Sequence, residues 1–258
     1  MKAALGRIAV VSAVLLAASV HVAAAQSSAA DDDDPGWGFV VAPYLLFPHM
    51  NGQTSVRGNP VDVDIGPGDI FDNLDFGAML YLEAANRDWA ITLDGLYMNL
   101  GAKGTTPVTE RDAEVDMKQL GITASGMWRV ESFAEIGIGG RFNSIEGGLI
   151  VAPGDIVLPG LDVSDTQSWF DPLIVLRFTA PLESSWKLGI RGDVGGFGMG
   201  SDITWQVFPF VGYRFSNLFE ISGGYRALGM KYDTGSGDDY FLYDMVIFGP
   251  QLGLVFHF

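Results

Sequence analysis

Histidine is scarce in this sequence, and its placement limits the catalysis that the chain could perform. The 258 residues hold three His, and His21 and His257 lie near the two ends. His49 is therefore the one imidazole placed to work beside a serine or a carboxylate. A serine hydrolase needs a nucleophile, a base and an orienting acid together. No G-x-S-x-G motif supplies the nucleophile, so we interpret His49 as a plain loop residue.

Other catalytic motifs are equally weak. The run Asp233-Thr234-Gly235-Ser236 spells the tetrad of aspartic proteases, but Asp and Gly are also the residues that a hairpin turn demands, and we interpret it as a turn. Phosphate-binding and zinc-protease motifs are missing from the sequence. With no Cys, a thiolate metal site and a Cys nucleophile are excluded. We therefore predict no enzyme and no cofactor.

Acidic residues gather between positions 48 and 75. Their carboxylates could hold Ca²⁺ or Mg²⁺, but the spacing does not match an EF-hand, so we expect a solvated loop without metal. The residues are Asp62, Asp64, Asp69, Asp72 and Asp75. The only hydrolase that these observations leave open is a surface enzyme, a protease or a lipid-modifying enzyme, that uses rim carboxylates with His49.

The remaining charges follow an alternation that identifies the elements carrying them. Between Trp186 and Val194, apolar residues occupy every second position and Lys187, Arg191 and Asp193 lie between them. A period of two is that of a β-strand with two different faces. Ten such segments are separated by alternately short and long connections, near residues 37–47, 76–86, 89–99, 116–130, 133–144, 169–180, 186–195, 204–215, 218–231 and 240–258.

Short turns that alternate with long loops are typical of an outer-membrane barrel, and an even strand number places both termini on the short-turn side. The predicted fold is thus an all-β transmembrane antiparallel barrel of about ten strands. Eight or twelve remain open, because Thr54–Ile65 could add a hairpin around the turn signal Arg57-Gly58-Asn59-Pro60. Residues Gly68–Phe76 could form one or two helical turns that cap the mouth.

The same parities place thirteen charged residues on the inward face, and we predict that they form a network of ion pairs. The acids are Glu83, Asp94, Glu135, Asp171, Asp193 and Glu220, and the bases are Arg129, Arg141, Arg177, Lys187, Arg191, Arg214 and Arg226. A buried charge is costly unless it is paired, and small barrels are filled by their side chains. We therefore expect a largely plugged lumen, which neutralising Arg177, Arg191 and Arg226 together should open or destabilise. The alternative is a passive, hydrated lumen.

Aromatic residues are expected at the strand ends, where they would meet lipid headgroups. Trp89, Trp128 and Trp186 adjoin predicted short turns. The last strand alternates Phe248, Pro250, Leu252, Leu254, Phe256 and Phe258 on one face. An aromatic last residue on such a strand resembles the C-terminal signal of outer-membrane barrels, which implies recognition of Phe258 by the barrel-assembly machinery.

The beginning of the chain resembles an export signal. Two cations, an apolar stretch and the site Ala23 to Ala25 predict a cleaved signal peptide over residues 1–25, with Ala30 as the alternative cleavage site. Residues 26–36 contain four consecutive Asp and are predicted to be a disordered acidic tail. Cleavage leaves 13 cations against 31 acids, a formal net charge of −18, which argues against nucleic acid as a partner.

Several stretches resemble a family of small proteobacterial outer-membrane barrel proteins that is mostly uncharacterised. The longest is Gly192-Asp193-Val194-Gly195-Gly196-Phe197-Gly198-Met199-Gly200-Ser201-Asp202-Ile203-Thr204-Trp205-Gln206, and others are Gly68–Phe76, Trp169–Pro172, Gly212–Phe215 and Gly224–Arg226. The resemblance implies location and fold, and it carries no activity.

We therefore expect an integral protein of the cell outer membrane whose barrel is formed by residues 37–258. It should contact outer-membrane lipid and lipopolysaccharide and have a structural, interaction or narrow-pore role. Its ligand and oligomeric state are left open.

Overall fold

The computed structural model describes residues 36–56, 59–105, 112–151, 161–182 and 185–258. The predicted signal peptide and the acidic tail up to Pro35 lie outside the described residues. In chain order the elements are β1 (Gly38–Leu46), β2 (His49–Val56), β3 (Asn59–Ile65), α1 (Pro67–Asp72), β4 (Leu74–Ala85), β5 (Trp89–Thr105), β6 (Asp112–Glu131), β7 (Ala134–Val151), β8 (Leu161–Pro181), β9 (Trp186–Gly196), β10 (Ile203–Arg214), β11 (Phe219–Thr234), the 3₁₀ turn η1 (Gly237–Asp239) and β12 (Phe241–His257).

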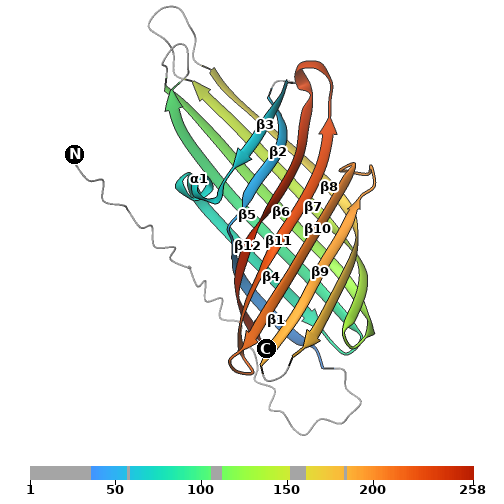
Figure 1. Cartoon of the computed structure of the whole chain (residues 1–258). Coiled ribbons are helices and arrows are strands. Elements are labelled where there is room, and N and C mark those ends of the chain that lie inside the picture. The colour runs from blue at the N-terminus through green and yellow to red at the C-terminus, as the bar shows by residue number, and fades with distance from the viewer. Residues whose placement is uncertain (1–35, 57–58, 106–111, 152–160, 183–184) are drawn as a thin grey trace, which may run out of the picture. The chain divides into compact units, whose positions relative to one another are not determined.

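Ten of these strands form a closed antiparallel barrel, as the alternation predicted. Strand β1 pairs with β4, each following strand pairs with the next, and β12 returns to pair with β1. Phe39 and Phe258 exchange backbone hydrogen bonds of 2.9 and 2.8 Å at this seam. Figure 1 shows the tilted strands and the C-terminus among the short turns at one end. Closure leaves no strand edge in this part of the wall.

The strand period separates an apolar outer wall from a mixed interior. On β6, Ile122 and Trp128 point outward and are 37% and 53% exposed, whereas Thr123 and Met127 point inward and are buried. The outward apolar positions of β6 run from residue 120 to 130, about the length that a tilted strand needs to cross a bilayer. Above them Lys118 pairs with Glu146 at 2.8 Å, so the outer wall becomes charged there.

An aromatic ladder marks the short-turn end of the barrel wall. The ring centroids of Trp186 and Tyr213 are 4.7 Å apart, and those of Tyr213 and Phe215 are also 4.7 Å apart. The ladder continues with 5.8 Å between Phe215 and Phe219 and 5.5 Å between Phe219 and Phe256. These rings belong to β9, β12 and the hairpin between them. This is the position of the aromatic girdle that the sequence predicted beside the short turns.

Four strands extend beyond the predicted limits. The connections expected at 100–115 and 145–168 are largely strand, with Thr105 paired to Asp112 and Val151 paired to Leu161. Past the apolar wall both faces of a hairpin meet water, so the sequence there loses the alternation that identifies a strand. Hydrogen bonding between neighbours nevertheless continues the ladder.

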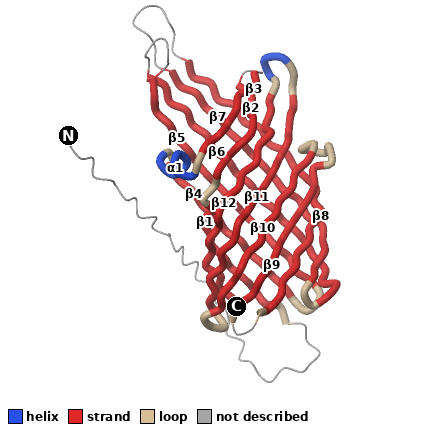
Figure 2. The backbone as a smooth tube through the Cα atoms, in the orientation of Figure 1, coloured by secondary structure: helices blue, strands red, loops and turns tan. Residues whose placement is uncertain are grey.

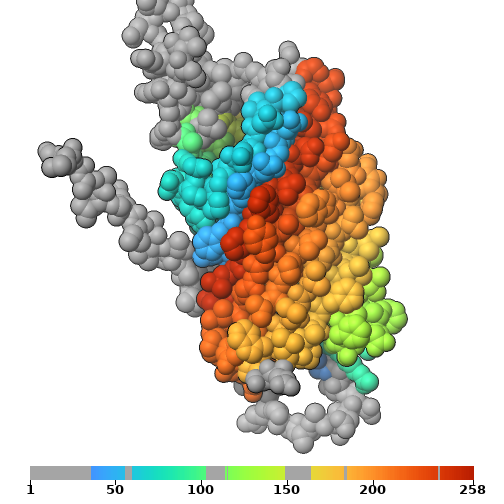
Figure 3. Space-filling view, in the orientation of Figure 1, coloured from blue at the N-terminus to red at the C-terminus, as the bar shows by residue number. Residues whose placement is uncertain are grey.

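The stretch predicted as a first outer loop is a hairpin followed by one short helix. Strand β2 pairs with the outer half of β12, from His49 opposite Phe248 to Thr54 opposite Tyr243, and β3 pairs with β2. The optional extra hairpin is thus present, and it begins at His49. Figure 3 shows it lying along β12 on the surface. Helix α1, beside it in Figure 2, buries Ile70 against the interior. Neither described helix is long and apolar enough to cross a membrane.

Candidate functional site

A large cavity lies inside the barrel at the short-turn end, and we call it the vestibule. Its volume is about 700 Å³ and residues of the short turns, including Ser132 and Ser185, reach its lining. The charged residues that line it are Arg129, Arg177, Lys187, Arg191, Arg214, Arg226, Glu83, Asp94, Glu135 and Glu220. Ten of the thirteen residues predicted from strand parity therefore meet around one space.

Two carboxylates and two guanidinium groups form a cluster on one side of the vestibule. Arg129 donates to Glu135 at 2.8 Å, and Arg177 bridges Glu135 to Glu83. The Tyr81 hydroxyl donates to Glu83. Because Arg177 holds two carboxylates in bonds from separate nitrogens, this cluster joins β4, β6, β7 and β8 across the interior.

A second cluster surrounds Glu220 near the start of β11. The carboxylate of Glu220 is buried, and it lies 2.8 Å from Lys187 Nζ and 3.2 Å from His257 Nε2. Arg214 is more distant, at 3.9 Å, and nearly half of its side chain is exposed. His257, which the sequence placed at the end of the last strand, thus contacts this lumen cluster.

A continuous chain of polar contacts crosses the barrel above the vestibule. The side chains involved are Thr123, Arg141, Thr204, Asp193, Gln206, Arg226, Asp94 and Tyr44, which we call the mid-barrel network. Arg141 contacts Asp193 at 2.7 Å, and Arg226 contacts Asp94 at 2.9 Å. Gln206 connects the two pairs. The network draws on seven of the ten strands, so it spans the lumen.

Asp171 is fully buried, and neutral groups rather than a cation satisfy it. It accepts hydrogen bonds from Asn143 at 3.1 Å, from the Trp169 indole at 3.1 Å and from the Ser201 backbone at 2.6 Å. Arg141, directly opposite on β7, instead bonds to Asp193. The prediction that Asp171 forms an ion pair is therefore wrong for the described residues, because Ser201 in the β9–β10 connection folds inward to meet it.

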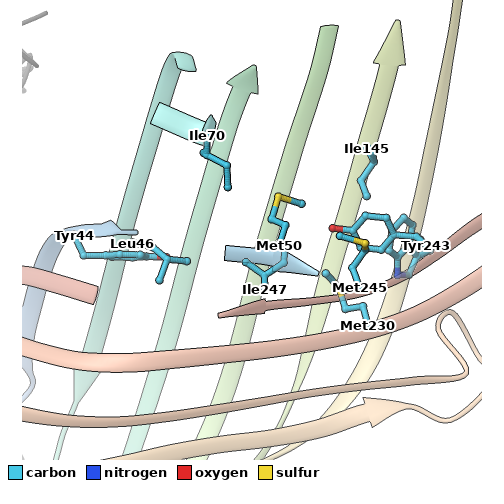
Figure 4. Packing of buried hydrophobic residues seen from close by; sticks show 10 residues of the cluster. Tyr44, Leu46, Met50, Ile70, Ile145, Met230, Tyr243, Met245 and Ile247 are labelled. Carbon is cyan, nitrogen blue, oxygen red and sulfur yellow. The ribbon is translucent and has the colours of Figure 1, made fainter. Parts of the chain in front are cut away.

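A cluster of apolar and aromatic side chains lies in the outer half of the interior. Ten buried residues pack together there, and we call them the outer cluster: Tyr44, Leu46, Met50, Ile70, Ile145, Trp169, Met230, Tyr243, Met245 and Ile247. Figure 4 shows nine of them labelled, gathered between strands of opposite walls. Trp169 stacks on Tyr232 with centroids 4.3 Å apart. Between this cluster and the mid-barrel network the remaining cavity is only about 30 Å³.

Eleven of the thirteen predicted network residues make at least one ion pair with a described residue; Asp171 and Arg191 make none. Arg191 is buried between Thr92 and Ser125. The sequence analysis missed the neutral partners Tyr44, Tyr81 and Gln206. They occupy the same inward parity as the charges, so the alternation that found the charges could also have found them.

His49 lies on the outer wall, away from these residues. Its Nε2 is 2.6 Å from Asp64, and its ring stacks on Phe248 at 5.0 Å. No serine hydroxyl is among the contacts of His49 within the described chain. No group of three or more His, Asp or Glu in the described part of the chain could hold a metal ion. The run 233–236 ends β11 and enters a turn, with Gly235 at φ +78°.

Comparisons with known proteins support the fold. They assign no activity to the chain. No protein-family model and no curated protein matches the sequence. The outer membrane protease OmpT from Escherichia coli is similar in structure, with a TM-score of 0.55 and 11% identity over 87% of this chain and 97% of that one. The translocator domain of NalP from Neisseria meningitidis has a TM-score of 0.45 and 13% identity, over 88% and 90%. At 11% identity, the likeness to OmpT shows the outer-membrane β-barrel fold alone.

Proposed function

We propose that this protein is a closed barrel of the bacterial outer membrane with a structural or interaction role, and that it is neither a diffusion pore nor an enzyme. The observation that carries the proposal is the pair of seals inside the barrel. The mid-barrel network crosses the lumen, and the outer cluster fills the space above it. A solute entering the vestibule meets both.

The narrow-pore alternative is disfavoured by the space between the seals. The cavity there is about 30 Å³, against about 700 Å³ in the vestibule. A hydrated ion would have to separate Arg226 from Asp94 or Arg141 from Asp193 in order to pass. Breaking a buried ion pair costs several kcal/mol, on the order of 3–5.

The outer wall supports the proposed lipid partners. Outward side chains such as Ile138 and Phe170 are 75% and 55% exposed, which suits hydrocarbon and not water. The extended hairpins of β5–β8 project past this wall, and they provide the surface for contact with lipopolysaccharide or another partner. We propose that Phe258, exposed at the seam, is the part that the barrel-assembly machinery recognises.

The hydrolase alternative has no nucleophile among the described contacts of His49. His49 and Asp64 form an imidazole–carboxylate pair, but both belong to the surface of the hairpin, and Asp64 is 73% exposed. A general base must lie within hydrogen-bond reach of the group that it activates. We propose that the pair holds the β2–β3 hairpin together.

Single-channel recording on refolded protein in planar bilayers tests the closed-barrel proposal. We expect no conductance steps, or only small and rare ones, whereas a general diffusion porin refolded in the same way gives large steps. Stable, large conductance from the unmodified protein would overturn the proposal.

A further inference from the structure

Arg191 is a buried cation that makes no direct ion pair with a described residue, and its guanidinium carbon lies 5.8 Å from the centroid of the Tyr81 ring. Its side chain is 6% exposed, and no carboxylate oxygen of a described residue lies within 4.0 Å. Nη2 donates to Thr92 at 3.3 Å and to Ser125 at 3.2 Å, while Nε and Nη1 have no acceptor among the described groups. Leaving a charged donor buried and unpaired is unfavourable. The fold therefore holds a cation that a ligand could neutralise.

The neighbour of Arg191 makes the excess of positive charge larger. Arg177 on β8 lies directly opposite it. Like charges at opposed positions destabilise a strand pair. The carboxylates that could relieve this pair, Glu83 and Glu135, are both bonded to Arg177.

The vestibule gives Arg191 access to a ligand-sized space. A volume of about 700 Å³ lies within the usual range for small-molecule sites. Six basic and four acidic side chains line it, and each of the four acids is already in an ion pair with a base. A small anion entering from the short-turn end would therefore meet a net positive lining.

One wall of the same cavity is apolar. Phe208 lies opposite Arg191 in the β9–β10 ladder, and its ring stacks with Phe210 at 5.5 Å. Val40 and Val255 also line the cavity. Apolar surface beside one cationic group selects a ligand with an apolar body and an anionic end.

We propose that the vestibule binds a small organic anion, with its carboxylate or phosphate group at Arg191 and its apolar body against Phe208 and Phe210. The site lies on the short-turn side of the mid-barrel network, so it needs no passage through the barrel. Binding and closure are consequently independent, and conductance measurements cannot decide between them.

Calorimetric titration of refolded protein in detergent tests the site with benzoate as the probe. Phenyl phosphate distinguishes a phosphate group from a carboxylate, and benzamide is the neutral control of the same shape. We expect benzoate or phenyl phosphate to bind and benzamide to bind at least about tenfold more weakly, because only the anions form a charge-assisted bond with Arg191. Titration of empty micelles corrects for partitioning into detergent.

Variants locate the binding. Arg191→Gln should weaken benzoate or phenyl phosphate binding about tenfold, Arg191→Lys should keep part of it, and Lys118→Gln on the outer wall should leave it unchanged. Equal binding of benzamide, no binding of either anion, or full affinity in Arg191→Gln would each overturn the proposal. Should Arg191→Gln fail to fold, the comparison of anion with benzamide on the unmodified protein still decides whether the site requires a charge.

Discussion

Arg177 and Arg191 occupy opposed positions on β8 and β9, and among the described residues only Arg177 has ion-paired carboxylate partners. Both guanidinium groups lie inside the barrel among polar side chains. The two arginines should therefore have opposite effects on the free energy of unfolding. Arg177 joins β8 to β4 and β7 through Glu83 and Glu135, whereas Arg191 makes no direct ion pair with a described residue.

This difference predicts the effect of removing a buried arginine. Replacing Arg191 with Met should leave the free energy of unfolding within about 1 kcal/mol of wild type or raise it, because it removes an unpaired charge. Arg141→Met should lower it by about 3–5 kcal/mol, because Asp193 would keep a buried charge without its cation. Urea unfolding followed by tryptophan fluorescence measures both.

Lys118→Met is the matched control for these two variants, since it removes an exposed ion pair and should change stability by less than about 1 kcal/mol. A loss at Arg191 as large as that at Arg141 would contradict the distinction between the two arginines.

The pairing of charges shows where sequence reasoning ends. Strand parity correctly predicts that Arg141 and Asp171 both face inward, and the two are opposite each other in the ladder. Arg141 nevertheless reaches Asp193 on β9, because a long guanidinium side chain can bypass its direct neighbour. Which carboxylate it pairs with depends on where the opposite wall and the β9–β10 connection lie in space. A local sequence pattern does not carry that information.

The fold was more predictable than the site. A wall with lipid outside and a mixed interior imposes a period of two, so all ten barrel strands could be located from alternation. The outer segments of β5–β8 were missed because side chains such as Glu146 are polar where the alternation would require apolar ones. The sequence left the β2–β3 hairpin as an alternative, because a turn signal alone does not tell which strand the hairpin pairs with.

The orientation of the barrel predicts which turns can be labelled from outside the cell. The chain has no Cys, so single substitutions report one position each. Ser236→Cys, in the exposed turn before β12, should react with a membrane-impermeant maleimide on intact cells, and Ser216→Cys, in a short turn, should react only after the outer membrane is opened. The reverse pattern, or recovery of the protein from the soluble periplasm, would contradict this orientation.

Removal of Phe258 should impair assembly. The residue closes the seam through two backbone hydrogen bonds to Phe39, and its side chain is 65% exposed. We expect deletion to reduce the folded, heat-modifiable band on gels, while Phe76→Ala, which removes an aromatic side chain with 58% exposure in the wall, leaves it near wild type. A folded band at native abundance after deletion would show that the seam tolerates the loss.

The two seals share Tyr44, but each should close the lumen when the other is damaged, and this arrangement changes what neutralising cations is expected to do. Arg141→Ala with Arg226→Ala removes the mid-barrel network, but the outer cluster remains above it. Conductance in planar bilayers should therefore stay near the blank, although stability falls. Neutralising Arg177, Arg191 and Arg226 should likewise destabilise the barrel without opening it.

Opening should require damage to both seals. Trp169→Ala with Tyr243→Ala creates a gap in the outer cluster, because these side chains approach to 5.9 Å between ring centroids and Trp169 also stacks on Tyr232. With the mid-barrel network intact, this pair of substitutions should not conduct. Combining the four substitutions should give clear conductance steps, since no layer then crosses the lumen. Large steps from either pair alone would show that one seal, and not two, closes the barrel.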